Sequence, residues 1–269
     1  MSKSVYYEDV KIIKKPAKKR LKNFLIFFSF VAIIALIFVI SVNLGNALSV
    51  GSIGSYLIYG DTSVTIKEQS VYAVLLGQYD DKKEAEQVAL GSTLQGASGV
   101  VWQFDKYLVV GNIYSSISDA NAVIENLKES KYSTSIQEIK YPSLKLKFAD
   151  FDNKDVKIIR ESIEYIDKLF DNIYTHSIDF DKKEINNFAV SSMLSEYRGE
   201  VKSYIGQLQR LLNKPNEKIQ SIQNTLIQID ELLNDGILKT IDNSTTNYTL
   251  KNISVCIAKY KYDLYQKIK

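Results

Sequence analysis

Cysteine and histidine are almost absent from this chain of 269 residues, and their scarcity limits the chemistry that it can perform. Cys256 is the only cysteine, so no disulfide can form within the chain and a disulfide-stapled scaffold is excluded. His176 is the only histidine, so a histidine-based zinc site or a Ser-His-Asp triad would have to be built around that side chain. We expect His176, in the charged stretch YTHSIDFD, to be a solvated surface residue, and Cys256 to be a small buried apolar residue.

Motifs that mark enzymes and cofactor sites are also missing. The sequence has no Gly-rich phosphate loop, no CxxC pair and no HExxH motif. A rival interpretation is an enzyme, such as a cell-wall hydrolase, that uses paired carboxylates in the C-terminal half. The acidic residues there have lysines close by, as in Lys182, Lys183 and Glu184, which is the pattern of a solvated helix face. The sequence therefore predicts a protein that is not an enzyme and that needs no metal and no cofactor.

Only one long hydrophobic run is present. From residue 24 to residue 42 the chain reads FLIFFSFVAIIALIFVISV, without a charged side chain. A helix of this length reaches about 28 Å at about 1.5 Å per residue, enough to cross a hydrocarbon core of about 30 Å. A cleaved signal peptide is the alternative, but its apolar segment is usually shorter, about 7–15 residues. We therefore predict a transmembrane helix at 24–42.

The charges beside this run predict its orientation. Residues 1–22 contain eight Lys or Arg against Glu8 and Asp9, a net charge of +6, and the whole chain carries +3, which leaves −3 for the remainder. Lys and Arg next to a membrane span stay on the cytoplasmic side. The pattern predicts a cytoplasmic tail at 1–23 and a single-pass protein of the cell membrane whose remaining residues are extracytoplasmic. A remainder with −3 gives no electrostatic reason to expect nucleic acid as a partner.

Short strands and amphipathic helices follow a linker that is rich in Gly and Ser. The linker covers residues 43–70 and contains one predicted short strand near 62–66. Beyond it we predict strands at 71–76, 100–104, 106–110 and 134–139, and helices at 82–94 and from residue 118 onward. Gly77 and Gly111 would close the first and third strands. The order βαββαβ predicts a four-stranded antiparallel sheet with both helices on one face, the split βαβ arrangement.

The two halves of this segment repeat each other, and the repeated residues resemble a known family. YAVLLGQYDDKKEAEQVA, from Tyr72, and YLVVGNIYSSISDANAVIENL, from Tyr107, each contain a strand, a glycine, an aromatic residue and a helix. Together they resemble the SPOR domain, a small module of bacterial envelope proteins, over residues 71–141. The resemblance implies a domain outside the membrane, in a single-pass protein of cell division or sporulation, that binds peptidoglycan glycan strands stripped of their peptide stems.

The resemblance also implies a sheet face that grips sugar through aromatic rings and polar side chains. Family members commonly carry Gln in the first strand and Arg on the third, where this chain has Leu75 and, on the third strand, Val109 with Tyr107. A place in the hydrophobic core is the competing interpretation for Trp102. The glycan contacts that we predict are the aromatic and polar residues that remain: Gln78, Trp102, Gln103, Tyr107 and Asn112.

After Pro142 the pattern turns helical. Apolar residues recur at steps of three and four in the stretches 156–173, 190–211, 219–233 and 250–268, which predicts four helices with a/d seams. Gly236 would lie just past the end of the third helix. Short connections favour an antiparallel bundle over residues 142–269. Such seams can close within one chain or pair with a second copy as a homo-oligomer, and the sequence does not separate these outcomes.

These features predict an α+β protein with an N-terminal transmembrane helix, a split βαβ SPOR-like domain and a C-terminal antiparallel helical bundle. The leading hypothesis is a membrane-anchored protein whose SPOR-like domain binds peptidoglycan glycan while the helical region contacts envelope or septal proteins. The alternative is a structural scaffold whose SPOR-like domain no longer binds glycan.

Overall fold

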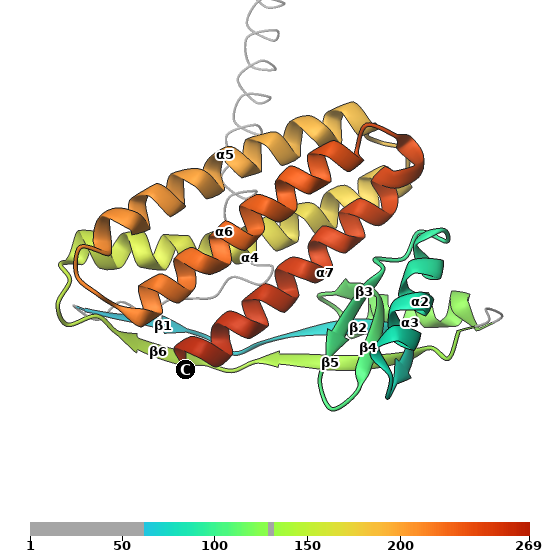
Figure 1. Cartoon of the computed structure of the whole chain (residues 1–269), viewed down its shortest axis with the longest axis horizontal. Helices are drawn as coiled ribbons and strands as arrows, with labels where there is room; N and C mark the ends of the chain where they lie inside the picture. The colour runs from blue at the N-terminus through green and yellow to red at the C-terminus, as the bar shows by residue number, and fades with distance from the viewer. Residues whose placement is uncertain (1–61, 129–131) are drawn as a thin grey trace, which may run out of the picture. The chain divides into compact units, whose positions relative to one another are not determined.

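The computed structural model describes residues 62–128 and 132–269, all of which lie within one compact unit spanning residues 53–269 (Figure 1). The predicted tail 1–23, the predicted transmembrane helix 24–42 and the linker up to residue 61 lie outside the described residues. Within the described ranges, no helix is long and apolar enough to cross a membrane. This part of the chain has six helices and two antiparallel sheets, which confirms the α+β class and the helical C-terminal region.

Residues 69–141 form a four-stranded sheet with two helices in the predicted order βαββαβ. Asp81 and Ser116 begin the helices, because their side chains accept hydrogen bonds from the backbone N–H groups of Glu84 and Ser118. The strands are antiparallel in the order β3-β4-β2-β5, so β2 and β4 are central and β3 is an edge strand. The elements are β2 (Gln69–Tyr79), α2 (Lys82–Thr93), β3 (Val100–Gln103), β4 (Tyr107–Tyr114), α3 (Ile117–Leu127) and β5 (Ser135–Tyr141).

Gly77 and Gly111 lie inside strands, not at strand ends as the sequence predicted. β2 continues to Tyr79 and β4 continues to Tyr114. The register of this strand pair shifts twice, because Gly111 is an extra residue on β4 and Leu76 is an extra residue on β2. A Cβ atom at Gly111 would lie 3.2 Å from the side chain of Leu76. Glycine is therefore used here for a bulge at which two strands approach closely.

A second, two-stranded sheet consists of β1 (Ser63–Ile66) and β6 (Leu144–Lys147), which pair antiparallel. β1 confirms the short strand predicted within the linker. β6 was not predicted, because the helical region was expected to begin directly after Pro142. The strand reads LKLK, with its leucines buried and its lysines exposed, and this alternation is too short to stand out beside long helices.

Four long helices follow, and each contains one of the predicted apolar seams. They are joined by short connections and neighbours run antiparallel, as expected (Figure 1). Gly236 lies inside the third of them and not past its end. A Cβ atom there would approach Ile253 Cδ1 to 2.6 Å, so glycine lets the last two helices pack closely. The helices are α4 (Asn153–Asp181), α5 (Asn187–Leu211), α6 (Glu217–Lys239) and α7 (Asn243–Ile268).

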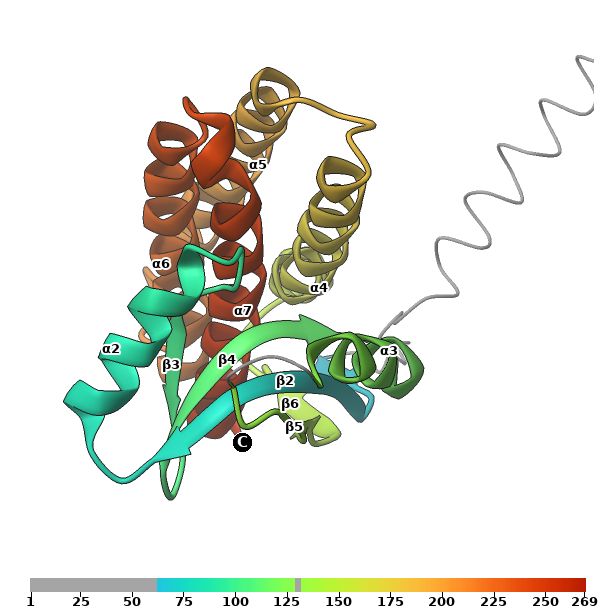
Figure 2. The same ribbon diagram turned by 90° about the vertical axis from the view of Figure 1, so that its right-hand side faces the viewer.

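The four-stranded sheet lies between two layers of helices (Figure 2). α2 and α3 cover one face, over a small core that includes Leu76, Ala85 and Val109. The bundle covers the other face, with α7 against β3 and β4. Val110 and Ile113 on that face belong to one continuous core that extends through the bundle. The segments 71–141 and 142–269, which the sequence analysis treated as separate domains, thus share one hydrophobic core.

A buried ion pair joins this sheet to the bundle. Lys261 on α7 pairs with Asp167 on α4, and both side chains are less than a tenth exposed. Lys261 Nζ also donates a hydrogen bond to Gln69 Oε1 at 2.6 Å and lies 4.4 Å from the centre of the Tyr141 ring. The Tyr141 hydroxyl donates to the backbone carbonyl of Ala258 at 3.1 Å. These contacts attach β2 and β5 to α7.

Asp171, four residues beyond Asp167 on α4, makes the stability of this unit depend on pH. Burial and the negative charge of Asp167 raise the pKa of the Asp171 carboxyl from 3.8 to about 7, against the opposing effect of Lys261. Between these two pKa values the folded state binds more protons than the unfolded state, so the free energy of unfolding falls as the pH rises. We expect the melting temperature to fall from about pH 4 to about pH 7. An Asp171→Asn variant should lose this part of the pH dependence, and an equal fall in the variant would contradict the assignment.

Candidate binding groove

The sheet face predicted to contact glycan is covered by the bundle. Trp102 on this face is 2% exposed. Its ring lies 5.2 Å from that of Phe104 and packs edge-on against Tyr262 of α7, with 5.7 Å between ring centroids. A ring enclosed in this way offers no free face to a pyranose. The prediction of Trp102 as a glycan contact is therefore corrected, because α7 places it in the core.

The other predicted contacts fall into three places. Gln103 and Tyr107 are brought together, since they are partners across the β3–β4 pair and line the same groove. Gln78 is exposed near the end of β2. Asn112 is buried and lines a separate cavity beside α2 and α3. The five predicted residues therefore do not form one site, but two of them do share one.

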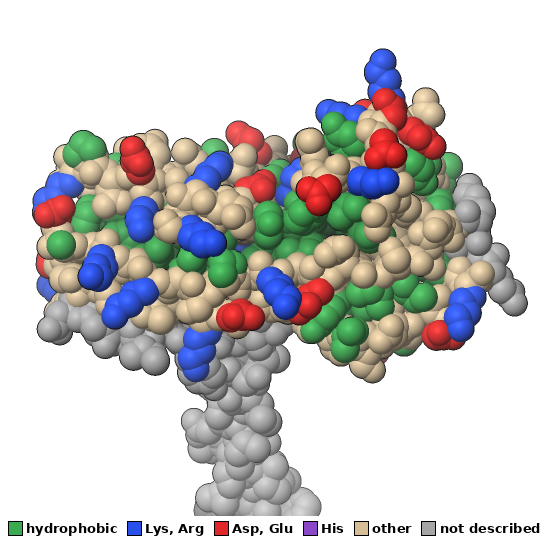
Figure 3. Space-filling model, turned by 90° about the horizontal axis from the view of Figure 1, so that it is seen from below, with side chains coloured by type: hydrophobic (Ala, Val, Ile, Leu, Met, Phe, Trp, Pro, Cys, Tyr) green, Lys and Arg blue, Asp and Glu red, His purple; other side chains and the backbone are tan. Residues whose placement is uncertain are grey.

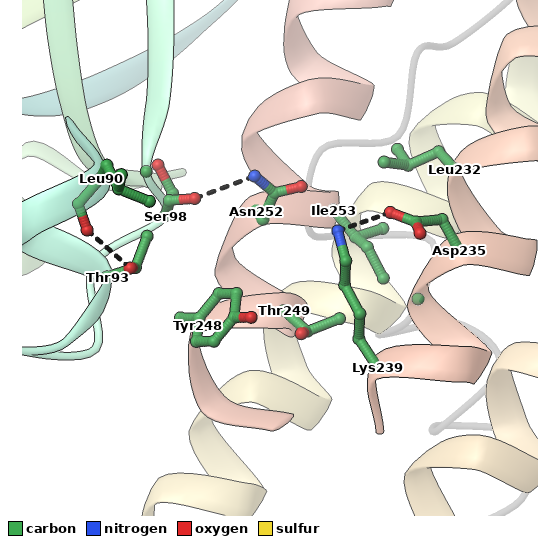
Figure 4. Close-up of a pocket in the computed structure, with 12 residues that line it drawn as sticks. Leu90, Thr93, Ser98, Leu232, Asp235, Lys239, Tyr248, Thr249, Asn252 and Ile253 are labelled. Carbon is green, nitrogen blue, oxygen red and sulfur yellow. Dashed lines mark hydrogen bonds and ion pairs between the residues drawn. The ribbon is translucent and has the colours of Figure 1, made fainter. Parts of the chain in front are cut away.

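The groove that holds Gln103 and Tyr107 runs along the edge strand β3, between α2 and α7. It has a volume of about 490 Å³ and is lined by residues of α2, β3 and β4, with Lys259 from α7. A second hollow of about 240 Å³ adjoins it and reaches α6 and α7 (Figure 4). The residues that line both parts are Leu90, Thr93 and Gly99.

The backbone before β3 shapes the junction of the two parts. Gly99 has φ of +68°, and a Cβ atom there would collide with the methyl group of Thr93, so glycine is required. Next to it, the Ser98 hydroxyl donates to the backbone carbonyl of Val110 at 2.5 Å. The side-chain amide of Asn252 donates to the Ser98 carbonyl at 2.9 Å, as Figure 4 shows. This bond ties α7 to the segment before β3, beside the second hollow.

Charged side chains line both parts of the groove. Lys82 and Glu86 pair at 3.4 Å across one turn of α2, and both are more than half exposed. Lys239 and Asp235 pair at 2.6 Å on α6, beside the second hollow. Exposed pairs of this kind contribute about 0–1 kcal/mol to stability, so their charges remain available to a ligand. Lys259 adds a further ammonium group from α7.

This combination of side chains suits an elongated ligand that is rich in hydroxyl groups. Tyr107 and Tyr248 contribute aromatic rings, and the Gln103 amide can both donate and accept hydrogen bonds. The volume of the wider part falls within the range of about 300–1,000 Å³ that is typical of ligand sites. On the face shown in Figure 3, charged side chains of both signs are interspersed, which differs from the basic stripe of a nucleic-acid interface.

The single cysteine and the single histidine lie in the helical bundle. Burial raises the pKa of the Cys256 thiol to about 11, which keeps it protonated and makes it a poor nucleophile at neutral pH. The side chain of His176 is 20% exposed, stacks on the Tyr197 ring and is hydrogen-bonded through Nε2 to the Tyr197 hydroxyl at 2.7 Å. It is therefore a packed residue and not the solvated one that the sequence predicted. In the ranges 62–128 and 132–269, no group of three or more His, Cys, Asp or Glu is placed to hold a metal.

Sequence reasoning missed the walls that α2 and α7 contribute to the groove. Lys82 and Glu86 have the spacing of an ordinary exposed helical ion pair. Lys259 lies more than 150 residues after the strand that it faces, so no local pattern connects the two. The predicted topology did contain one signal for the position of the groove. The second strand of a split βαβ sheet, here β3, lies at an edge of the sheet.

Comparisons with known proteins add no relative. No protein-family model matches the chain, and neither curated proteins nor solved structures show a match.

Proposed function

We propose that this chain is a single-pass membrane protein with a SPOR-like domain that binds peptidoglycan glycan along the edge groove. The resemblance of residues 71–141 to SPOR domains and the βαββαβ order support the proposal. The observation that carries it is the meeting of Gln103 and Tyr107, both predicted as glycan contacts, in one open groove. The hydrophobic run at 24–42 would tether the groove on the outer side of the membrane, within reach of the wall in cell division or sporulation.

The chemistry of glycan strands without peptide stems fits the groove. Removal of the stems frees the lactyl carboxylate of each N-acetylmuramic acid, so such a strand carries regularly spaced negative charges. Lys82 and Lys259 present ammonium groups from two different walls. Tyr107 can cover a pyranose ring, and Gln103 can pair with hydroxyl or acetamido groups. A glycan strand bound in this groove does not require α7 to move away from the sheet face.

Burial of the sheet face supports a second candidate function, a scaffold whose SPOR-like domain no longer binds glycan. In this alternative the domain is a structural support for the bundle, and envelope or septal proteins bind the helices. Phe188 at the start of α5 and Leu238 and Ile241 at the end of α6 are large apolar residues that are more than 60% exposed. A hydrogen bond of 3.0 Å from Asn187 to the Ile241 carbonyl brings these two helix ends together.

Retention on purified sacculi separates the two candidates. We expect the fragment 53–269 to bind sacculi better after amidase treatment, which removes the stems. Gln103→Ala should weaken retention about five- to tenfold, the effect of losing one hydrogen bond of about 1–1.4 kcal/mol. Gln137→Ala is the matched control, because Gln137 is exposed on β5 and does not line the groove. Absence of binding to both preparations would remove the glycan proposal and favour the scaffold.

A further inference from the structure

A separate cavity lies on the other side of α2, between α2, α3 and the sheet. Its volume is about 170 Å³, and it shares no lining residue with the edge groove. Most of its walls are apolar. The residues that form them are Val74, Leu76, Ala97, Val123, Leu127 and Tyr132.

The paired bulges of β2 and β4 shape the floor of this cavity. Gly111 has no side chain and lies against Leu76, so part of the floor is bare backbone. Asn112 follows directly. Its neighbour Ile113 points into the core shared with the bundle, and side chains alternate along a strand. The Asn112 side chain is therefore directed toward the helices α2 and α3, where it lines the cavity.

Asn112 brings an unused hydrogen-bond acceptor to this apolar space. The residue is 8% exposed, and its Oδ1 atom has no hydrogen-bond partner within the described ranges. Its amide interacts with the Tyr114 hydroxyl, which leaves Oδ1 as the free group. A buried acceptor without a partner is unfavourable, so a donor that reaches it is favoured. The torsion that turns an Asn amide is soft, so Oδ1 can rotate toward the cavity.

The charge at the cavity favours a neutral ligand. Lys251 of α7 is the only charged residue in the lining, and its ammonium group already pairs with Asp181 at 3.3 Å. Asp181 also accepts a hydrogen bond from the side-chain amide of Asn247. The positive charge of Lys251 is thus largely offset, and an anion would have to break this ion pair to bind there.

We propose that this cavity binds a small neutral aromatic molecule with one N–H or O–H donor on its ring, of the size of indole or phenol. The volume sets the size, since an apolar cavity of about 150 Å³ accepts one benzene ring. The apolar walls favour a ligand with an apolar ring, and Asn112 favours one that carries a hydrogen-bond donor. This site is independent of the edge groove, so it stands whether or not that groove binds glycan.

Indole and indene form a matched pair of probes, because indene has a methylene group where indole has N–H. Titration of each into the fragment 53–269, followed by amide chemical shifts and by calorimetry, should show that both bind. Indole should bind about tenfold tighter, the effect of one hydrogen bond, with shifts centred on Leu76, Asn112 and Val123. Equal affinities would overturn the role of Asn112. Absence of binding by indole at about millimolar concentration would overturn the site itself.

Three variants locate the binding. Asn112→Leu should remove the preference for indole over indene. Val123→Trp should fill the cavity and abolish binding of both probes while the circular dichroism spectrum is kept. Gln103→Ala, in the edge groove, should bind indole like the unmodified fragment. Binding that survives Val123→Trp would place the probes elsewhere and contradict the proposal.

Discussion

Replacing Trp102 by alanine is expected to destabilise the fragment 53–269 by about 3–5 kcal/mol, the usual cost of removing a large aromatic side chain from a core. The indole ring is enclosed by the sheet on one side and by Tyr262 of α7 on the other. Its loss opens a cavity between two layers, so sheet and bundle should lose stability together. Urea unfolding followed by far-UV circular dichroism measures the change.

An exposed aromatic residue provides the control for this experiment. Phe188 is 80% exposed, so Phe188→Ala should change the free energy of unfolding by no more than about 0.5 kcal/mol. The same experiment tests the corrected role of Trp102. If Trp102→Ala unfolded at the same urea concentration as the parent but no longer bound sacculi, Trp102 would be a glycan contact after all.

Removing Lys261 alone is expected to cost about 3–5 kcal/mol, because Lys261→Met leaves the Asp167 carboxylate buried without its positive partner. Gln69, whose amide lies 3.5 Å from Asp167, cannot neutralise that charge. Replacing both residues, as Asp167→Leu with Lys261→Met, removes both charges from the interior. The double variant should regain most of the lost stability, since the cost of desolvating two ions disappears with them.

A double-mutant cycle on melting curves measures this coupling. Lys239→Met is the matched control, because the Lys239–Asp235 pair is about half exposed and its loss should cost no more than about 1 kcal/mol. If Lys261→Met were as mild as Lys239→Met, the buried pair would not be what holds the sheet to the bundle. If the double variant were as unstable as Lys261→Met, packing and not charge would explain the loss.

Apart from β6, the helices and strands were predictable because their signals are local. Each bundle helix has an apolar seam two or more heptads long, and the strand-glycine-helix repeat marks both halves of the sheet domain. The predicted ends of strands and helices were wrong where glycine has more than one structural use. Gly77 and Gly111 suggest turns in sequence, but the structure uses them at or beside bulges inside strands. Gly236 suggests a helix end, but its lack of a side chain serves the contact between α6 and α7.

The covering of the sheet face was missed although α7 carries a signal for it. The seam predicted in 250–268 is a single apolar stripe on this helix, formed by Ile253, Ile257, Tyr260 and Leu264. A second stripe follows steps of three, four and three, and it is buried or packed against the core. A helix that is apolar on two sides is buried on two sides. The second stripe comprises Val255, Ala258, Tyr262 and Tyr265.

The edge groove could not be predicted from the sequence, for a different reason. Its walls come from segments far apart in the chain, and its charged residues have the pattern of an ordinary exposed surface. Gln103 and Tyr107 were predicted as polar and aromatic side chains on the strands, and the pairing of β3 with β4 brings them together. To predict Lys259 as a groove residue, one would need to know where α7 lies on the sheet. That position depends on long-range packing.

Because α7 is buried on two sides and is synthesised last, the sheet face stays uncovered by this helix for part of the synthesis. A chain that emerges N-terminus first completes the βαββαβ segment well before α7, the last of the four bundle helices. At about 5–20 residues per second, the interval is on the order of 10 s. Throughout it, Trp102 and the apolar sheet face are not covered by α7, and the folded unit is incomplete. The sheet face is therefore a transient aggregation hazard during synthesis, which only the arrival of the last helix removes.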